Sequence, residues 1–218
     1  RMQSKQAYGI TYPLVTKSDG TKFGKSSGGA IWLDSEMTSP YSFYQFWINT
    51  ADSDVMNYLK IFTFFARDEL VELSAAHVSD PGDRKAQVML AQAMTRLVHG
   101  DSGLEAAERI TDALFSNSLG VLAADDFGQL AQDGMPSSIA KNGAALVDVL
   151  VSSGLAVTPK GAVTVGQARK LILGNSISVN GAKQADIDLM LTSETALFER
   201  FFIVQKGKKN HHLLVLSS

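Results

Sequence analysis

The chain has 218 residues, of which 45% are hydrophobic and 19% are charged, and its formal net charge is −2. These proportions are typical of one or two globular domains, and no apolar run approaches the roughly 20 residues of a membrane-spanning helix. The chain has no cysteine, which excludes disulfides, thiolate catalysis and zinc fingers, and its four histidines lack zinc-ligand spacing, so we expect no metal site.

The first predicted element is a strand at residues 10–16, ITYPLVT, which is rich in β-branched side chains and ends at a turn. A basic, glycine-rich loop follows. It resembles the phosphate-binding motif G-x-x-x-x-G-K-[ST], but Asp19 stands where the first glycine is required, and poor helix formers follow the motif. We therefore reject a P-loop, and two readings stay open: a phosphate-contacting loop or an ordinary solvated turn. The basic part of the loop is Lys22-Phe23-Gly24-Lys25-Ser26.

The middle of the chain predicts helices alone. Ser39 followed by Pro40 is typical of a helix start, with the serine as N-cap and the proline as first helical residue. Tyr44 and Trp47 share one face of this helix, and we read that face as core rather than as a platform for stacked bases. Further helices are expected from Asp52 or Ser53, as a cap, to a break at 80–82, then at 84–99 and 103–115, with Gly100 ending the first of these two.

The last third of the chain predicts short helices and strands. We place a domain boundary near residues 135–142, where the hydrophobic periodicity is weak. The expected elements are helices at 144–153 and 165–173, a strand within SISVNG at 176–181 that ends in an Asn-Gly turn, and a hairpin of two apolar runs at 201–205 and 211–216 flanking a basic turn.

The charged residues are unevenly distributed. Residues 1–34 carry five Lys or Arg and two Asp or Glu, residues 35–159 carry seven and sixteen, and residues 160–218 carry eight and four, which gives +3, −9 and +4. Basic ends on either side of an acidic middle suit a polyanion that is contacted at separate places. Chance clustering on solvated faces is the alternative.

The order of these motifs resembles that of one enzyme family. The loop KFGKS is followed by GGAIWLD and SPYSFYQFWINTADSDV, and the helix–strand unit GQARKLILGNSISVNG comes near the end. Together they resemble bacterial tyrosyl-tRNA synthetases, which are class I aminoacyl-tRNA synthetases. The first block is similar to the family's K-M-S-K-S signature, and the second to its C-terminal S4-type RNA-binding module. The resemblance covers the whole chain and is most specific over residues 9–65 and 166–216.

The resemblance implies an α+β fold in three parts. Residues 1–34 would be the terminal strand and loop of a Rossmann-type catalytic domain, residues 35–138 an all-helical anticodon-binding bundle, and residues 139–218 a small S4-like α+β RNA-binding domain. The family's H-I-G-H-like ATP motif and tyrosine pocket do not occur in this sequence, and the chain begins with Arg1 instead of methionine. We therefore expect an incomplete chain that keeps the loop and the tRNA-binding domains and is inactive alone.

The function implied by the resemblance is that of a tyrosine–tRNA ligase, which activates tyrosine with ATP and transfers it to tRNA(Tyr). Its partners would be tRNA(Tyr), tyrosine and Mg-ATP, with ATP as a substrate and no bound metal or prosthetic group in this chain. The full-length family is cytoplasmic and homodimeric, and we expect no membrane contact. The alternative is a stand-alone structured-RNA-binding protein without catalysis, and a third reading is a purely structural helical bundle. The KFGKS loop favours the ligase, because an RNA-binding protein does not need a pyrophosphate loop.

The resemblance also assigns site residues. Lys22 and Lys25 would be catalytic, because two ammonium groups within the KFGKS loop can stabilise the charge that develops on the leaving pyrophosphate. Asn49, Asp52 and Asp54 lie near a helix junction, and we read the aspartates as caps rather than as base contacts. The residues expected to contact RNA are Gln167, Arg169, Lys170, Lys206, Lys208, Lys209 and Asn210.

Overall fold

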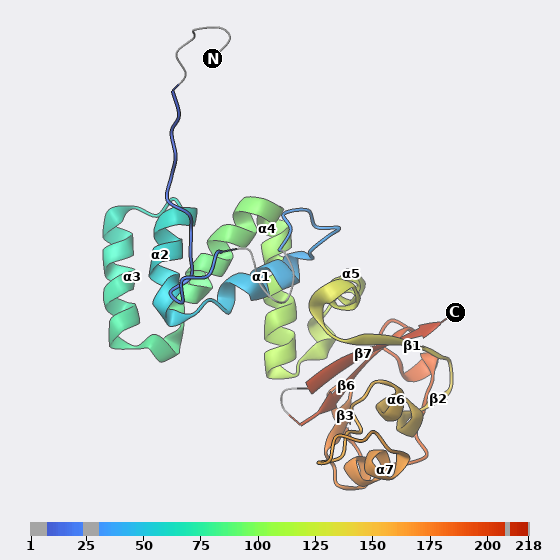
Figure 1. The fold of residues 1–218 in the computed structure, drawn as a ribbon. Coiled ribbons are helices and arrows are strands. Elements are labelled where there is room, and N and C mark those ends of the chain that lie inside the picture. The colour runs from blue at the N-terminus through green and yellow to red at the C-terminus, as the bar shows by residue number, and fades with distance from the viewer. Residues whose placement is uncertain (1–7, 24–30, 208–209, 218) are drawn as a thin grey trace, which may run out of the picture.

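The computed structural model describes residues 8–23, 31–207 and 210–217. A helical region comes first and a mixed sheet with its own helices follows (Figure 1). The helices of the first region are α1 (Pro40–Ile48), α2 (Asp52–Phe62), α3 (Arg67–Ser79), α4 (Lys85–Ser116) and α5 (Ala124–Gln129). Within the described residues, no helix is long and apolar enough to cross a membrane. The chain therefore combines helices and a sheet, as the sequence predicted.

The start of α1 confirms the prediction made from Ser39 and Pro40. The Ser39 hydroxyl accepts a hydrogen bond from the amide of Ser42, and Pro40 is the first helical residue. A remote carboxylate reinforces this cap, since Asp133 accepts from the Ser39 amide at 3.0 Å and from the Ser42 hydroxyl at 2.8 Å. The helix start is thereby tied to a segment more than ninety residues later in the chain.

The next stretch corrects two predictions. Neither Asp52 nor Ser53 caps α2, because the N-cap position is Ala51 and makes no side-chain cap bond. Asp52 instead accepts a hydrogen bond from Gln87 of α4, at 2.5 Å. The predicted continuous helix is also divided: the Thr63 hydroxyl donates to the Leu59 carbonyl at 2.6 Å where α2 ends, and α3 begins only at Arg67. A long-range partner thus takes the Asp52 side chain away from capping, whereas a local side-chain bond marks the end of α2.

The long helix α4 contains the predicted pair of helices in one bent element. Gly100 has φ 72° and ψ −177°, a non-helical conformation in the left-handed half of φ space that glycine adopts at little cost. Residues on both sides of this bend are fully buried, among them Leu90, Ala91, Ala107 and Ile110. The predicted end of the first helix at Gly100 is therefore confirmed as a kink.

The strand predicted at residues 10–16 is not formed. Only Thr16 makes a β-bridge there, with Lys22, and the apolar side chains of Ile10 and Tyr12 are more than 80% exposed. β-Branched composition favours a strand only where a neighbouring strand can take up the backbone hydrogen bonds. Among the described residues no strand lies beside this segment, so the prediction from composition alone was wrong.

The C-terminal sheet has five strands in the order β1-β7-β6-β3-β4. The predicted Asn180-Gly181 turn joins β3 to β4, and the predicted hairpin is formed by β6 and β7. Strand β1 pairs in parallel with β7, and the other pairings are antiparallel. The strands are β1 (Ser137–Lys141), β3 (Ile177–Val179), β4 (Ala182–Gln184), β6 (Phe201–Lys206) and β7 (Asn210–Ser217), beside a small pair of β2 (Ala144–Ala145) and β5 (Met190–Leu191).

Both faces of the β6–β7 hairpin are buried. On one face, Phe202 and Leu214 pack against the predicted helices, now observed as α6 (Leu146–Ser152) and α7 (Val165–Leu173). On the other face, Phe201 and Leu213 share a core cluster with Phe127 of α5. Burial on both faces explains why these strands read as continuous apolar runs instead of alternating ones. The sheet is therefore packed directly onto the helical region (Figure 1).

Candidate functional site

Residues 15–23 form a small hairpin, called here the Lys22 hairpin. Its arms pair through the Thr16–Lys22 bridge, and the Phe23 amide donates to the Val15 carbonyl at 3.0 Å. At its turn, the Asp19 carboxylate accepts from the amide and the hydroxyl of Thr21, and these hydrogen bonds lower the pKa of Asp19. The sequence predicted this turn, but the short pairing of its arms is set by the turn's own hydrogen bonds.

The hairpin is attached to the start of α2. The Ser18 amide donates to the Asp54 carboxylate at 2.7 Å, and the Ser18 and Ser53 hydroxyls lie 2.9 Å apart. Asp54 is only 8% exposed, so this carboxylate has exchanged water for protein contacts. Asp54 is therefore a docking residue for the hairpin, a role that spacing along the sequence cannot reveal.

Lys22 and Phe23 are the two described residues of the predicted KFGKS loop, and they face different surroundings. The Lys22 side chain is exposed, whereas Phe23 packs into an aromatic cluster. The cluster consists of Phe23, Phe46, Trp47, Tyr58 and Phe62. Trp47 is 3% exposed, which confirms the reading of this aromatic face as core. Gly24, Lys25 and Ser26 lie outside the described residues.

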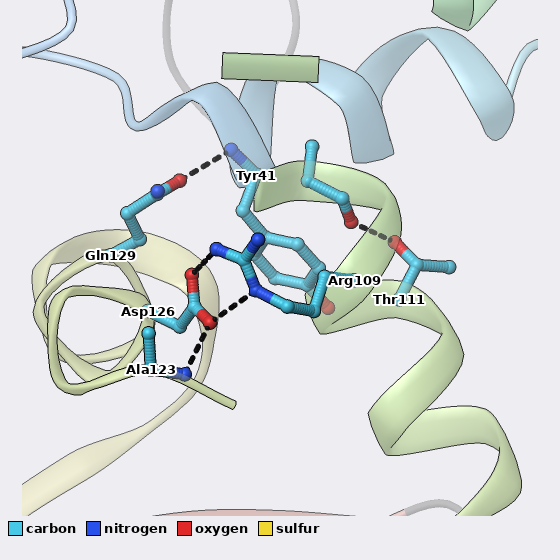
Figure 2. Close-up of polar contacts among 7 residues, drawn as sticks. Tyr41, Arg109, Thr111, Ala123, Asp126 and Gln129 are labelled. Carbon is cyan, nitrogen blue, oxygen red and sulfur yellow. Dashed lines mark hydrogen bonds and ion pairs between the residues drawn. The ribbon is translucent and has the colours of Figure 1, made fainter. Parts of the chain in front are cut away.

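An ion pair between half-buried Arg109 and buried Asp126 fastens α5 to α4 (Figure 2). Arg109 Nε and Nη2 donate to the two carboxylate oxygens of Asp126 at 2.8 and 2.7 Å, and the Ala123 amide donates to the same carboxylate. The hydrogen bond to Asp126 raises the pKa of Arg109. Close by, the Gln129 side chain accepts from the Tyr41 amide of α1 at 2.9 Å. These contacts, which the sequence did not indicate, join three helices beneath the sheet.

The RNA-contact residues predicted on α7 lie on its solvent side. Arg169 and Lys170 are exposed and Gln167 is half-buried, whereas Ala168 and Ile172 of the same helix are fully buried. Thr164 caps this helix by accepting from the Gln167 amide at 3.1 Å. The predicted orientation of α7, with its basic residues outward, is what the structure shows.

The RNA-contact residues predicted on the β6–β7 turn differ from one another in exposure. Asn210 is exposed, but the Lys206 ammonium donates to the Leu155 carbonyl at 2.7 Å and the residue is half-buried. The Gly207 amide donates to the Ser176 carbonyl, just beyond the end of α7, so the helix end and the turn are neighbours. Lys208 and Lys209 lie outside the described residues.

A cavity of about 830 Å³ lies between the helical region and the sheet. Its lining includes Phe115, which is 94% exposed at the end of α4, together with Lys183 and Gln205 from the sheet. Asn117 bridges the two regions at this place by donating to the Gly181 carbonyl at 3.1 Å. The sequence analysis missed this cavity, because its walls come from elements that are far apart along the chain.

Within the ranges that the structure describes, no group of three or more His, Cys, Asp or Glu side chains is placed to hold a metal ion. The side chains of the candidate site described above include lysine, arginine, amide and aromatic groups, which are suited to phosphates and bases.

Comparison with known families identifies the class of the chain. Residues 1–116 match the model of the class I tRNA synthetases (W and Y), so the chain belongs to this family. Residues 126–214 match the tyrosine–tRNA ligase SYY-like C-terminal domain. The two matches follow the order of the motifs in the sequence and confirm the resemblance stated from them.

Individual relatives narrow the class further. The chain is 50% identical over 214 residues to the tyrosine–tRNA ligase of Pectobacterium carotovorum subsp. carotovorum, covering 98% of this chain and 49% of the relative. The values are the same for the tyrosine–tRNA ligase of Escherichia coli K12 / DH10B. The chain thus spans about half the length of the relatives it matches. A C-terminally truncated mitochondrial tyrosyl-tRNA synthetase from Coccidioides posadasii is 44% identical over 45% of this chain and 25% of its own, with a TM-score of 0.39.

Proposed function

We propose that this chain is part of a tyrosine–tRNA ligase, which activates tyrosine with ATP and transfers it to tRNA(Tyr). The observation that carries the proposal is the 50% identity to tyrosine–tRNA ligases over 98% of the chain. The chain would contribute the pyrophosphate side of the active site and the regions that bind tRNA. The remainder of such an enzyme would supply the adenine and tyrosine sites, in a cytoplasmic homodimer.

In the activation step, a tyrosine carboxylate oxygen attacks the α-phosphorus of ATP and pyrophosphate leaves. Negative charge builds on the leaving oxygens, and Lys22 and Lys25 are proposed to stabilise it. An ammonium group is a compact charge with three donors, which suits a group of phosphate oxygens. A metal ion that accompanies ATP would enter with the substrate. Donors that act on developing charge lower the barrier without tightening tyrosine binding.

In the transfer step, RNA contacts away from the chemistry hold the tRNA in register. The sheet with α6 and α7 is proposed to be an S4-like RNA-binding domain at residues 139–218, and the helices at 35–138 an anticodon-binding domain. Exposed Arg169 and Lys170 support phosphate contacts. The exposed ring of Phe115, which lines the same cavity as Lys183, supports contact with unpaired bases. Lys208, Lys209, Asn210 and Gln167 complete the proposed RNA-binding set, whereas Lys206, which the sequence also placed in it, donates to the Leu155 carbonyl.

The test joins this chain to the part of the Pectobacterium relative that it does not match. We expect the joined protein to exchange labelled pyrophosphate into ATP when tyrosine is present, and to charge tRNA(Tyr). The 218-residue chain alone serves as the control and is expected to stay at background. RNA binding without any exchange in the joined protein would favour the alternative, a structured-RNA-binding protein without catalysis.

A further inference from the structure

Phe23 is packed against the helices, whereas Lys22, the other described residue of the KFGKS segment, is exposed. Its ring is stacked on Trp47 at a centroid distance of 5.6 Å and lies 5.0 Å from Tyr58 and 5.1 Å from Phe62. Phe46 completes the enclosure at 5.9 Å. Aromatic pairs at such distances stabilise the packing beyond the burial of their area. The ring is therefore held between α1 and α2 by several contacts at once.

The Lys22 hairpin has attachments to the helical region at its two ends. Its turn is held by Ser18, through the Asp54 carboxylate and the Ser53 hydroxyl. Its last arm is held by Phe23, which follows Lys22 directly. The hydrogen bonds inside the hairpin move with it and do not fix its orientation. Without the Phe23 ring, the hairpin would keep the Ser18 attachment and the packing of Val15 on its first arm, but the arm that carries Lys22 would lose its own contact with the helices.

We propose that Phe23 is a positioning residue for Lys22. Its ring fixes the arm of the hairpin that carries Lys22, so that the exposed ammonium group is presented from a constant place on the helical region. The inference rests on the proposed function and assigns a task to a residue of the loop that carries no charge. A displacement of about 1 Å in a catalytic group can cost about a hundredfold in rate.

The first test uses deuterium exchange on the 218-residue chain. The amides of Lys17, Ser18 and Phe23 donate hydrogen bonds that hold the hairpin and dock it. Phe23→Leu removes the ring and keeps an apolar side chain, and we expect exchange across residues 15–23 to become at least about tenfold faster. Exchange in α4 should not change, which would show that the fold persists.

The matched control is Phe62→Leu. Phe62 belongs to the same cluster, with ring centroids 5.2 Å from Trp47 and 5.8 Å from Tyr58, but it lies on α2 and not on the hairpin. It also contacts Phe23 at 5.1 Å, so Phe62→Leu removes one of the four rings around Phe23 and leaves the other three in place. Loss of this ring weakens the cluster without cutting the attachment of Lys22. We therefore expect hairpin exchange within about threefold of the unsubstituted chain. Equal acceleration in both variants, or none with Phe23→Leu, would overturn the proposal.

The second test measures kinetics in the joined enzyme described above. Phe23→Leu should lower kcat of tyrosine-dependent pyrophosphate exchange by about 10- to 100-fold, with KM for tyrosine within about twofold. Phe23→Tyr should restore most of the rate, because a cavity of about 500 Å³ beside the ring leaves space for a hydroxyl. Phe62→Leu should keep kcat within about threefold.

The outcomes separate the inference from the function on which it rests. If the unsubstituted joined enzyme shows no exchange, the proposed function fails, while deuterium exchange still decides whether Phe23 holds the hairpin. If the joined enzyme is active and Phe23→Leu raises KM for tyrosine with kcat unchanged, Phe23 does not position Lys22 and the proposal is wrong. A fall in kcat with Phe23→Leu, together with a nearly normal kcat in Phe23→Tyr, supports the proposal.

Discussion

Two basic hairpins of the molecule hold their lysines in opposite ways. In the Lys22 hairpin, the neighbouring Phe23 makes the packing contacts and the Lys22 side chain is exposed. In the β6–β7 hairpin, the lysine itself makes the contact, because the Lys206 ammonium donates to the Leu155 carbonyl at 2.7 Å. A lysine whose donors bind a backbone carbonyl has fewer of them left for a phosphate. The first lysine is therefore open to solvent, as its proposed role requires, whereas the second is engaged within the fold.

The largest expected effect concerns the chemical step. In the joined enzyme, Lys25→Ala should slow tyrosyl-adenylate formation, because roughly 2–4 kcal/mol of transition-state stabilisation is lost. Removing one donor to developing charge is the guide for this figure. Tyrosine affinity should hardly change, since the loop acts on the leaving group. Single-turnover measurements of adenylate formation would give both quantities.

The control for this prediction is Lys206→Ala, which removes an equal charge from the other hairpin. Adenylate formation should continue at nearly the original rate, because the Lys206 ammonium is engaged inside the C-terminal region. If the two variants lose rate equally, the distinction drawn between the hairpins is wrong.

The second expected effect is on stability. Lys206→Met keeps the length of the side chain and removes the charged donor to the Leu155 carbonyl, so the free energy of unfolding should fall by about 1.5–3 kcal/mol. Lys22→Met, on an exposed side chain, should change it by no more than about 0.5 kcal/mol. Urea unfolding of both variants followed by circular dichroism gives the two values. A similar loss in the two would mean that the Lys206 contact adds nothing in solution.

Much of the fold could be predicted because local signals agreed with the tertiary packing. Ser39 and Pro40 define the start of α1, Gly100 is the bend of α4, and the Asn180-Gly181 turn adopts positive φ at both residues, 48° and 84°. In each case the residue type favours, or tolerates better than most others, the conformation that the structure shows. The turn, the cap and the bend follow from the side chain alone.

The failures share a different cause. Asp52 is a good cap by type, but Gln87, 35 residues away, binds its carboxylate. The strand expected at 10–16 needs a neighbour that does not lie beside it among the described residues. The strand β1 was missed because its pairing with β7 is a long-range contact made by a short, polar segment. Long-range partners decide these places, and a single sequence does not name them.

The candidate site likewise has features that the sequence predicts and features that only the structure reveals. Lysines in a glycine-rich loop and on the outer side of α7 were visible as a pattern of charge. The docking of Asp54 on Ser18, the aromatic enclosure of Phe23 and the inward bond of Lys206 were not, because each depends on what lies opposite in space. Charge along the chain therefore indicated which residue types to consider, and the packing separates the residues available to a ligand from those that hold the fold.

The third expected effect is on RNA binding and its dependence on salt. Each phosphate neutralised contributes about 0.7–0.9 to the log–log slope of affinity against salt. If exposed Arg169 and Lys170 each contact a phosphate, replacing both with alanine should flatten the slope by roughly 1.4–1.8. Lys206→Met should leave the slope almost unchanged. Filter binding of tRNA at several salt concentrations measures this, and the reverse ranking would make Lys206 the RNA contact after all.

The smallest expected effect is a pH dependence of stability that arises on the sheet. His212 is 4% exposed, and its Nε2 lies 2.7 Å from the Ser138 hydroxyl, across the pairing of β7 with β1. Burial lowers the pKa of His212 below its ordinary value of 6.5, so the folded chain favours the neutral ring while the unfolded chain binds a proton more readily. The stabilisation is therefore complete above about pH 6.5 and declines as the pH falls below it.

The loss of unfolding free energy at low pH has an upper limit, and a substitution can show the share that is due to His212. At about pH 5.5, one unit below the unfolded pKa, a single histidine can cost at most about 1.4 kcal/mol. His212→Gln keeps a polar partner for Ser138 but does not titrate, so its free energy of unfolding should fall less between about pH 7 and pH 5.5 than that of the unsubstituted chain. His99, whose pKa burial also lowers, is present in both chains and cancels in the difference. Urea unfolding at a series of pH values measures that difference, and parallel curves for the two chains would show that His212 titrates in the folded sheet as it does in water.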